Sequence, residues 1–319
     1  MAELLQTLVA AVLLGSVYAL IALGYTMVYG ILRFINFAHG DMVVLGAWLS
    51  YTLGQHALPR AGVDLQNVPW WAGGLVLALT MAICAAVGLV VERLAYRPLR
   101  RAPRINVLIA AIGVSLFLQN AGQLNYVFGT QPQRMPELLR DSTLIDVPLV
   151  GRDGNLQHVV IGTIGVTIVA TAAVLLVGLR LLVFHTRLGT AMRAVSYNTE
   201  TAALMGINVD RVIAVTFMIG TALAAAAGFL YSMRYPSLSQ PANAQWVLLG
   251  LKAFVAAVVG GIGNVTGAVA GGFVIAAIEQ FGAYGLSSNL RDVYVFATLI
   301  LVLLVRPTGL FGSPIPEKV

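Results

Sequence analysis

Charged side chains are scarce in this sequence. Asp, Glu, Lys and Arg make up 10% of its 319 residues, whereas an ordinary soluble domain carries roughly 25%. Hydrophobic residues make up 59%, and the mean hydropathy is +0.86. The shortage of charge excludes an ordinary soluble protein and predicts an integral membrane protein. The net charge of +6 does not indicate nucleic-acid binding, because the basic residues cluster beside apolar segments, where membrane topology would place them.

Other features are also missing. The single cysteine, Cys84, cannot form an intrachain disulfide and says little about redox compartment. The N-terminus has no basic region, and its apolar run of about 28 residues is too long for the core of a signal peptide, so we expect a retained first span. No stretch rich in Pro, Gly or Ser divides the chain. We therefore expect one transmembrane permease domain over residues 1–319, and we see no internal repeat in the sequence.

Long apolar stretches are what the sequence does contain. They predict an all-α integral membrane protein, a polytopic bundle of about eight or nine transmembrane helices with broken or re-entrant segments. The candidate spans are 4–32, 41–55, 69–91, 105–128, 158–183, 211–233, 246–262, 265–281 and 292–305.

Basic residues predict which loops are cytoplasmic. The stretch 92–104 holds five arginines against one acid, Glu92. These are Arg93, Arg97, Arg100, Arg101 and Arg104. The stretch 129–157 is instead slightly acidic, with Arg134, Arg140 and Arg152 against Glu137, Asp141, Asp146 and Asp153. We expect 129–157 to be an outer loop, 184–210 to be cytoplasmic, the N-terminus to be outside and the C-terminus inside.

The stretch 35–41, INFAHGD, places polar side chains between two apolar runs. Asn36, His39 and Asp41 would fit a plain cytoplasmic turn. However, the apolar run that follows, 42–53, has only about 12 residues, which is short for a full crossing unless the polar stretch lies within the membrane. Irregular backbone at that depth must be buried in protein or line a water-filled cavity. We favour a broken helix beside a translocation pathway.

The same polar residues do not predict a metal or catalytic site. His39 and Asp41 supply only two donors, and no His/Cys cluster lies near them in the sequence. The sparse acids are not grouped as paired carboxylates, and no nucleophile with a base is apparent, which argues against an intramembrane enzyme. We expect no catalytic residue, no bound metal and no cofactor on this chain.

A glycine-rich stretch, GGIGNVTGAVAGG, occupies residues 260–272. Its glycines recur every fourth residue at Gly263, Gly267 and Gly271. On a helix this spacing would put them on one face, where small residues let two helix backbones approach closely. Packing alone explains the pattern. The alternative is that GGIGN breaks the span at a transporter gate, with Asn264 and Thr266 at the break.

Two ionisable residues interrupt the apolar sequence around this stretch. Lys252 and Glu279 would be expected to face a cavity, a partner or the membrane surface. The long side chain of Lys252 can reach the surface, whereas the shorter Glu279 does so only near a helix end. We therefore include Glu279 among the candidates for the translocation pathway.

The segment 184–210 carries the signals of a short helix at about 199–205. Asn198 can cap its start, Glu200 favours its positive N-terminal end, and Gly206 suits the left-handed conformation that ends a helix. The apolar face is formed by Ala202, Ala203, Leu204 and Met205. It is too small to fold alone but fits the groove of another protein. The alternative is a helix that rests on lipid, for which more Lys, Trp or Phe is expected.

Four stretches together resemble a known family. They are GYTMVYGILRFINFAHGDMVVLGA, RAVSYNTETAALMGINVDRV, VVGGIGNVTGAVAGG and, at 306–312, RPTGLFG. In this order and at this length, the chain resembles the LivH-type membrane subunits of ABC importers for branched-chain amino acids, part of a larger permease family that includes sugar permeases.

The resemblance implies a division of labour. Such proteins lie in the bacterial cytoplasmic (inner) membrane and pair with a related LivM-like permease, two LivG/LivF-like ATPase subunits and a periplasmic binding protein. The helix at 198–206 would be the coupling helix, and INFAHGD would lie beside the translocation path. The sequence agrees, because it lacks the phosphate loop G-x-x-x-x-G-K-S/T, so ATP and Mg would be bound by the partner subunits. The expected coupling residues are Arg193, Asn198, Glu200, Ala203, Leu204, Met205 and Gly206.

Rival functions remain open at this point. The same machinery could move urea, short amides or aromatic acids, and nothing in the chain separates these from branched-chain amino acids. An ion-coupled secondary transporter would need coupling carboxylates near the midplane, where only Asp41 and Glu279 are available. Transport by the isolated chain under an ion gradient would support that alternative.

Overall fold

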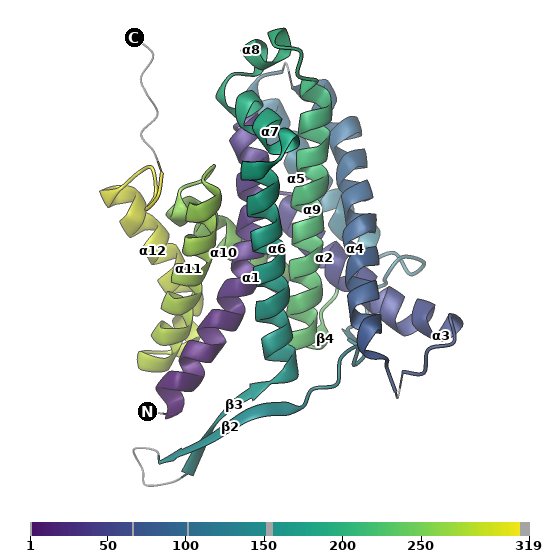
Figure 1. Ribbon diagram of the computed structural model, residues 1–319, viewed down its shortest axis with the longest axis vertical. Helices are drawn as coiled ribbons and strands as arrows, with labels where there is room; N and C mark the ends of the chain where they lie inside the picture. The colour runs from purple at the N-terminus through teal and green to yellow at the C-terminus, as the bar shows by residue number, and fades with distance from the viewer. Residues whose placement is uncertain (1, 66, 101, 151–155, 313–319) are drawn as a thin grey trace.

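The computed structural model of the chain describes residues 2–65, 67–100, 102–150 and 156–312 (Figure 1). Arg101, Arg152 and Asp153, which entered the topology argument, lie outside these residues. The main helices are α1 (Ala2–Leu32), α2 (His39–Thr52), α4 (Trp70–Val91), α5 (Arg104–Gly122), α6 (Thr163–His185), α7 (Arg187–Tyr197), α8 (Thr199–Leu204), α9 (Val209–Arg234), α10 (Ala244–Gly260), α11 (Val265–Gly285) and α12 (Arg291–Val305). Shorter helical turns are η1 (Leu53–Ala57), α3 (Leu58–Arg60), η2 (Glu92–Tyr96), η3 (Arg97–Leu99) and η4 (Ser288–Leu290), and the strands are β1 (Gln133–Arg134), β2 (Thr143–Val150), β3 (Leu156–Gly162) and β4 (Ser237–Leu238).

The polytopic helical fold predicted from the apolar stretches is confirmed. Among the described residues, 7 helices are long and apolar enough to cross a membrane, and α10 is a shorter apolar helix. These 7 are α1, α4 with its extension to Leu99, α5, α6, α9, α11 and α12 with its preceding turn. The helix that begins with α2 continues through η1 and α3 to Arg60. Most predicted spans match these helices within a few residues.

The stretch before α6 differs from the prediction. Residues 129–157 were expected to form a loop and 158 to begin a span, but β2 and β3 form an antiparallel hairpin in which Pro148 pairs with His158. Hydropathy misplaces the start of α6 because a short apolar run such as HVVIG, 158–162, does not distinguish a strand from a buried helix. The hairpin projects from the end of the bundle at which the N-terminus lies (Figure 1). We call this the hairpin end and the opposite one the α8 end.

The long helices α1 and α9 form the centre of the bundle. Each is largely buried, whereas α4, α5, α6 and α12 expose most of their apolar surface. Small residues allow the central contacts. A Cβ at Gly272 in α11 would lie 2.6 Å from the Ala19 nitrogen of α1, and Gly46 and Gly228 bring α2 equally close to α9. Close approach through small residues is how helices associate in a membrane.

The two halves of the chain repeat one arrangement in opposite orientations. α1 leads through the connection 33–38 to α2, and α9 leads through 235–243 to α10. α1 runs toward the α8 end, whereas α9 runs toward the hairpin end (Figure 1). α1 packs on α10 and α11, and α9 correspondingly packs on α2 and α4. α2 and α10 meet at Gly40 and Gly250. This is an inverted repeat of the kind that many transporters contain.

Candidate functional site

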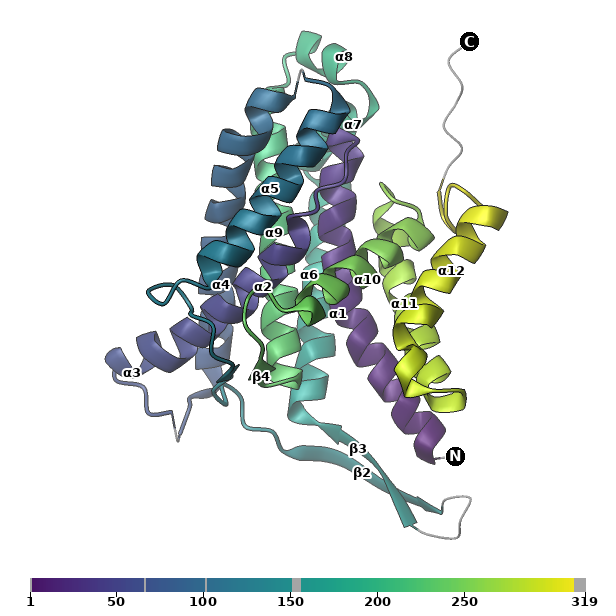
Figure 2. The same cartoon turned by 180° about the vertical axis from the view of Figure 1, so that it is seen from behind.

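The polar stretch 35–41 leads into a helix that starts inside the bundle. Figure 2 shows that the chain turns back after α1 and that α2 begins part way along the bundle. Arg33 adopts a left-handed φ of 57° at the turn, and Asn36, His39 and Asp41 are all buried. The arrangement is therefore not a plain turn but a re-entrant one, because the chain reverses after α1 and leads back to a helix that begins inside the bundle.

Asn36 and His39 are held by aromatic neighbours. The hydroxyl of Tyr96 donates a hydrogen bond to Asn36 Oδ1 at 2.6 Å. The ring of His39 lies against that of Tyr25, with 4.5 Å between the centroids. It fits there because Gly24 has no side chain, since a Cβ at that position would overlap the imidazole. These contacts fix the start of α2 against α1 and the end of the α4 extension.

Asp41 faces α5 in the first turn of α2. Its Oδ1 accepts a hydrogen bond from Gln119 Nε2 at 2.9 Å, and the same amide donates to Ser115 Oγ at 3.2 Å. A small hollow adjoins the carboxylate, lined by Asp41, Val44, Leu45, Leu118, Gln119, Gly122, Phe128 and Pro241. The polar group thus lies at the edge of a mostly apolar space between α2, α5 and the connection 235–243.

Glu279 belongs to a separate buried network. Lys252 Nζ lies 2.8 Å from Glu279 Oε1 and 2.6 Å from Asp292 Oδ1, and the hydroxyl of Tyr18 donates to Glu279 Oε2 at 2.7 Å. The four side chains join α1, α10, α11 and α12. Sequence reasoning considered Lys252 and Glu279 separately and missed the other two partners. No local signal reveals them, because Tyr18 and Glu279 are separated by 261 positions.

The glycine-rich stretch forms the turn between α10 and α11. Gly261 and Gly263 both adopt positive φ values, 105° and 96°, so Gly263 lies outside α11 and does not share a helix face with the other two glycines. Gly267 and Gly271 do pack against the backbone of α10. Thr266 is exposed in the first turn of α11.

Asn264 and the closing RPTGLFG segment stabilise this turn together. Asn264 Oδ1 accepts a hydrogen bond from Gly267 N at 3.1 Å and caps α11, while its Nδ2 donates to Phe311 O at 2.8 Å. The backbone amides of Leu310 and Phe311 donate to the carbonyls of Val259 and Gly260, which end α10. Two of the stretches that carried the family resemblance therefore contact each other directly.

The six pathway candidates thus lie in three neighbourhoods. Asn36, His39 and Asp41 gather at the start of α2, Glu279 lies in the lysine network, and Asn264 and Thr266 lie at the turn between α10 and α11. Their contacts favour a structural role for Asn264 and Glu279, while a role of the first three in transport stays a prediction.

The short helix at the tip of the α8 end has the predicted geometry. Asn198 Oδ1 accepts hydrogen bonds from Glu200 N and Thr201 N at 3.0 Å each, and Gly206 adopts a φ of 83°. Leu204 is 88% exposed and Met205 79%. Ala203 and Glu200 are exposed as well, whereas Ala202 is buried. The apolar surface that sequence analysis assigned to docking is therefore presented at the tip, without Ala202.

Arg193 lies away from that surface. Its Nη1 donates to Val183 O at 2.5 Å, and its guanidinium lies 5.5 Å from the centroid of the Phe184 ring. It therefore fixes the corner between α6 and α7.

Two sets of polar contacts connect the α8 end to the membrane-spanning helices. Ser196 Oγ of α7 donates to Gly30 O at 2.5 Å, and Arg33 Nη2 donates to Ser196 O at 3.0 Å. α7 is thereby tied to the end of α1, directly before INFAHGD.

The second set lies at the start of α9. Asp210 pairs with Arg97 at 2.5 Å and with Arg100 at 2.6 Å, and Arg100 also pairs with the buried Glu92. Asp210, which lies at the start of α9 shortly after α8, is therefore linked to the extension of α4. Sequence analysis used these arginines only for topology.

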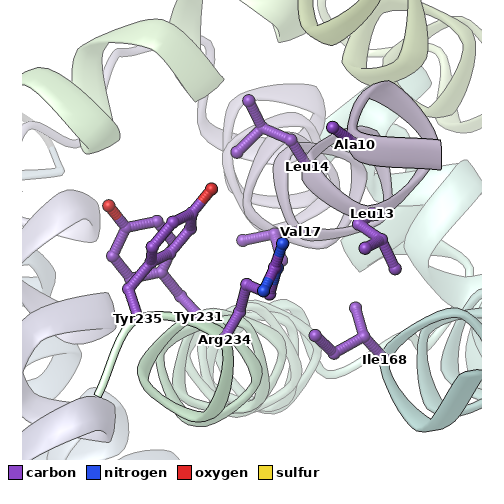
Figure 3. A pocket seen from close by; sticks show the side chains of 8 residues that line it. All are labelled: Ala10, Leu13, Leu14, Val17, Ile168, Tyr231, Arg234 and Tyr235. Carbon is purple, nitrogen blue, oxygen red and sulfur yellow. The ribbon is translucent and has the colours of Figure 1, made fainter. Parts of the chain in front are cut away.

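Hollows that open to the surface lie at the hairpin end of the bundle. Two hollows of about 270 and 380 Å³ lie there, and both are lined by Asp141 and Arg234. Arg234 also borders a narrower hollow between α1, α6 and α9, in which Tyr231 and Tyr235 lie side by side (Figure 3). The narrower hollow leaves about 20 Å³, which is room for about one water molecule.

A bundle of apolar helices with two helices that begin inside it, an inverted repeat and an exposed helical tip defines a multi-pass membrane protein of the transporter class. The chain belongs to the family described as "Branched-chain amino acid transport system / permease component", which matches residues 7–304.

Three relatives illustrate the likeness. The chain is 40% identical over 315 residues to the high-affinity branched-chain amino acid transport system permease protein BraD of Pseudomonas aeruginosa, which covers 99% of this chain and 98% of the relative. It is 41% identical over 317 residues to LivH of Escherichia coli (strain K12), covering 99% and 97%. A probable LivH of Methanocaldococcus jannaschii is 29% identical over 313 residues, covering 95% and 90%. The resemblance noted from the sequence is confirmed.

Proposed function

We propose that this chain is a permease subunit of an ABC importer that moves branched-chain amino acids into the cytoplasm. The observation that carries the proposal is the likeness to BraD and LivH, which extends over nearly the full length of both chains. The chain itself is not an enzyme and binds no cofactor. ATP and Mg are bound by ATPase subunits in trans, in keeping with the missing phosphate loop.

The proposed assembly contains a related LivM-like permease, two LivG/LivF-like ATPases and a periplasmic binding protein in the inner membrane. The α8 end faces the cytoplasm and the hairpin end the periplasm, so that the N-terminus is outside. Five arginines lie toward the α8 end, and by the positive-inside rule they support this orientation. They are Arg93, Arg97, Arg100, Arg187 and Arg193.

In the proposed mechanism, α8 fits the groove of an ATPase and moves when ATP binding closes the two ATPases. The Ser196–Gly30 and Arg33–Ser196 bonds carry the movement of α7 to the start of α2. The Asp210 ion pairs carry it to α4. Because α1 and α9 pack through small residues, these helices can shift as rigid bodies and open the bundle to alternate sides.

The test is reconstitution of the importer. The chain, carrying an affinity tag, is extracted in mild detergent, its partners are identified by mass spectrometry, and the complex is placed in liposomes with its binding protein. We expect a related permease and two ATPases, and ATP-dependent accumulation of leucine. Accumulation of urea or an aromatic acid but not leucine would show that the cargo is not a branched-chain amino acid. Transport by the chain alone under an ion gradient would contradict the mechanism.

A further inference from the structure

One face of the bundle carries irregular backbone at the depth of the helices. The connections 33–38 and 235–243 both lie on the face formed by α2, α5 and α10, which Figure 2 turns toward the viewer. The indoles of Trp48 and Trp246 both donate to the carbonyl of Ser239 at 3.2 Å and fix the second connection there. Lipid cannot satisfy irregular backbone, so this face must border protein or a water-filled cavity.

Asp41, on this face, differs from the other buried acids of the described residues. Those acids are Glu92 and Glu279, and each is paired with a cation, Arg100 and Lys252 respectively. Asp41 is also only 7% exposed, but among the described residues its carboxylate forms no ion pair and is held by the uncharged side chains of Gln119 and Ser115. A carboxylate buried at membrane depth without a cation is costly. Either a proton or a positively charged partner from outside the chain would remove this cost.

The space beside Asp41 limits what that partner can be. The hollow leaves about 20 Å³ for a water-sized group, which suits an ammonium group but not a guanidinium or a whole side chain. Its walls are otherwise mostly apolar, and Val44, Leu45 and Leu118 approach from α2 and α5. A ligand with a small cationic group and an aliphatic chain matches both the charge of Asp41 and the apolar walls of the hollow. Its aliphatic chain would lie on the open face of α5.

We propose that Asp41, oriented by Gln119, binds the α-ammonium group of the cargo as it passes this face. The site is selective for primary ammonium compounds with a short aliphatic body and does not take urea, neutral amides or acids that lack an amine. The proposal rests on the proposed function in that it takes the cargo to be an amino acid.

A purely structural role of Asp41 makes a different prediction. An acid in the first turn stabilises a helix through the positive end of the helix dipole. That role predicts a loss of stability on substitution by Asn but no preference for amines. The test therefore needs a measurement of ligand binding that stability does not influence.

The measurement is protection of a cysteine in the hollow. In the full complex, Cys84 is replaced by Ala and Leu118 by Cys, and the rate of modification by a thiol reagent is measured. Leucine and 3-methylbutylamine should slow modification several-fold, whereas 4-methylpentanoate, which has the same body without the amine, should not. In the Asp41→Asn background the protection by both amines should disappear. If the complex with Leu118→Cys fails to assemble, Leu45→Cys is used in its place.

A matched variant and a transport assay complete the test. Ser50→Ala removes another buried polar group of α2, one that faces Thr80 and not the hollow, and should keep both protection and uptake. Asp41→Asn should lower the leucine imported per ATP hydrolysed about tenfold, because an ion pair is replaced by a weaker hydrogen bond, and Asp41→Glu should restore part of it.

Protection by 4-methylpentanoate, the absence of protection by any amine, or protection and uptake that survive Asp41→Asn would overturn the site. A different outcome separates the site from the cargo. If the wild-type complex does not import leucine, but amines still protect Leu118→Cys and this protection depends on Asp41, the cargo assignment is overturned and the site stands.

Discussion

At the scale of residues, the two pathway candidates Asp41 and Glu279 differ in the partners of their buried carboxylates. Glu279 has Lys252 and Tyr18 as partners and connects four helices. Asp41 has only uncharged partners, the Gln119 amide and the Ser115 hydroxyl, and an adjoining hollow. Both acids are equally plausible pathway residues in the sequence, because hydropathy reports only that an acid interrupts an apolar run. What distinguishes them is the partner that folding supplies.

The lysine network gives a prediction at this scale. Lys252→Met should lower the free energy of unfolding by roughly 3–5 kcal/mol, because Glu279 remains buried without its cation. Thermal unfolding of the detergent-purified complex measures the loss. The double variant Lys252→Met with Glu279→Gln should recover most of it, since Gln keeps a polar contact with Tyr18 without a charge. A single variant as stable as wild type would show that the pair contributes little.

At the scale of elements, the sequence predicted α8 well because its signals are local. Contacts between segments far apart in the sequence were not predicted. Asn198 and Gly206 act on their own helix, so the chemistry of two residues fixes its start and end. The hairpin of β2 and β3 was missed because its apolar run also suits a helix. The contact between GGIGN and RPTGLFG was missed because it joins segments more than 40 positions apart, as the 47 positions between Asn264 and Phe311 show.

The packing of α10 on α11 gives a second prediction. Gly267→Leu should destabilise the protein by at least about 1–3 kcal/mol, because the side chain would overlap the backbone of Gly260. The matched control is Gly178→Leu in α6, where a Cβ meets nothing within 4 Å. Yield and thermal stability of the purified complex compare the two. Equal behaviour of the two variants would mean that α10 and α11 tolerate separation.

The exposed tip gives a third prediction. Glu200→Arg combined with Leu204→Asp should leave insertion in the membrane intact but abolish leucine uptake and its stimulation of ATP hydrolysis, because the docking surface reverses charge and loses its apolar contact. Glu200→Gln with Leu204→Met keeps the shape and should behave as wild type. Normal uptake by the charge-reversed variant would remove α8 from the coupling mechanism.

At the scale of the whole molecule, the inverted repeat explains why two helices can begin within the membrane. α2 and α10 begin inside the bundle, meet at Gly40 and Gly250, and are covered by α9 and α1. The apolar runs predicted the number and approximate limits of the helices, since length and hydropathy are local properties. The repeat could not be predicted, because its two halves share an arrangement of helices without a visible similarity of sequence.

The central claim is that the molecule is moved from its α8 end by ATPases in the cytoplasm. Its most direct test is a photo-activated cross-linker attached to Leu204→Cys in a Cys84→Ala background of the intact complex. We expect attachment only from the cytoplasmic side and cross-links to an ATPase subunit that change in yield when ATP binds. Attachment from the periplasmic side, or cross-links to lipid alone, would contradict the claim.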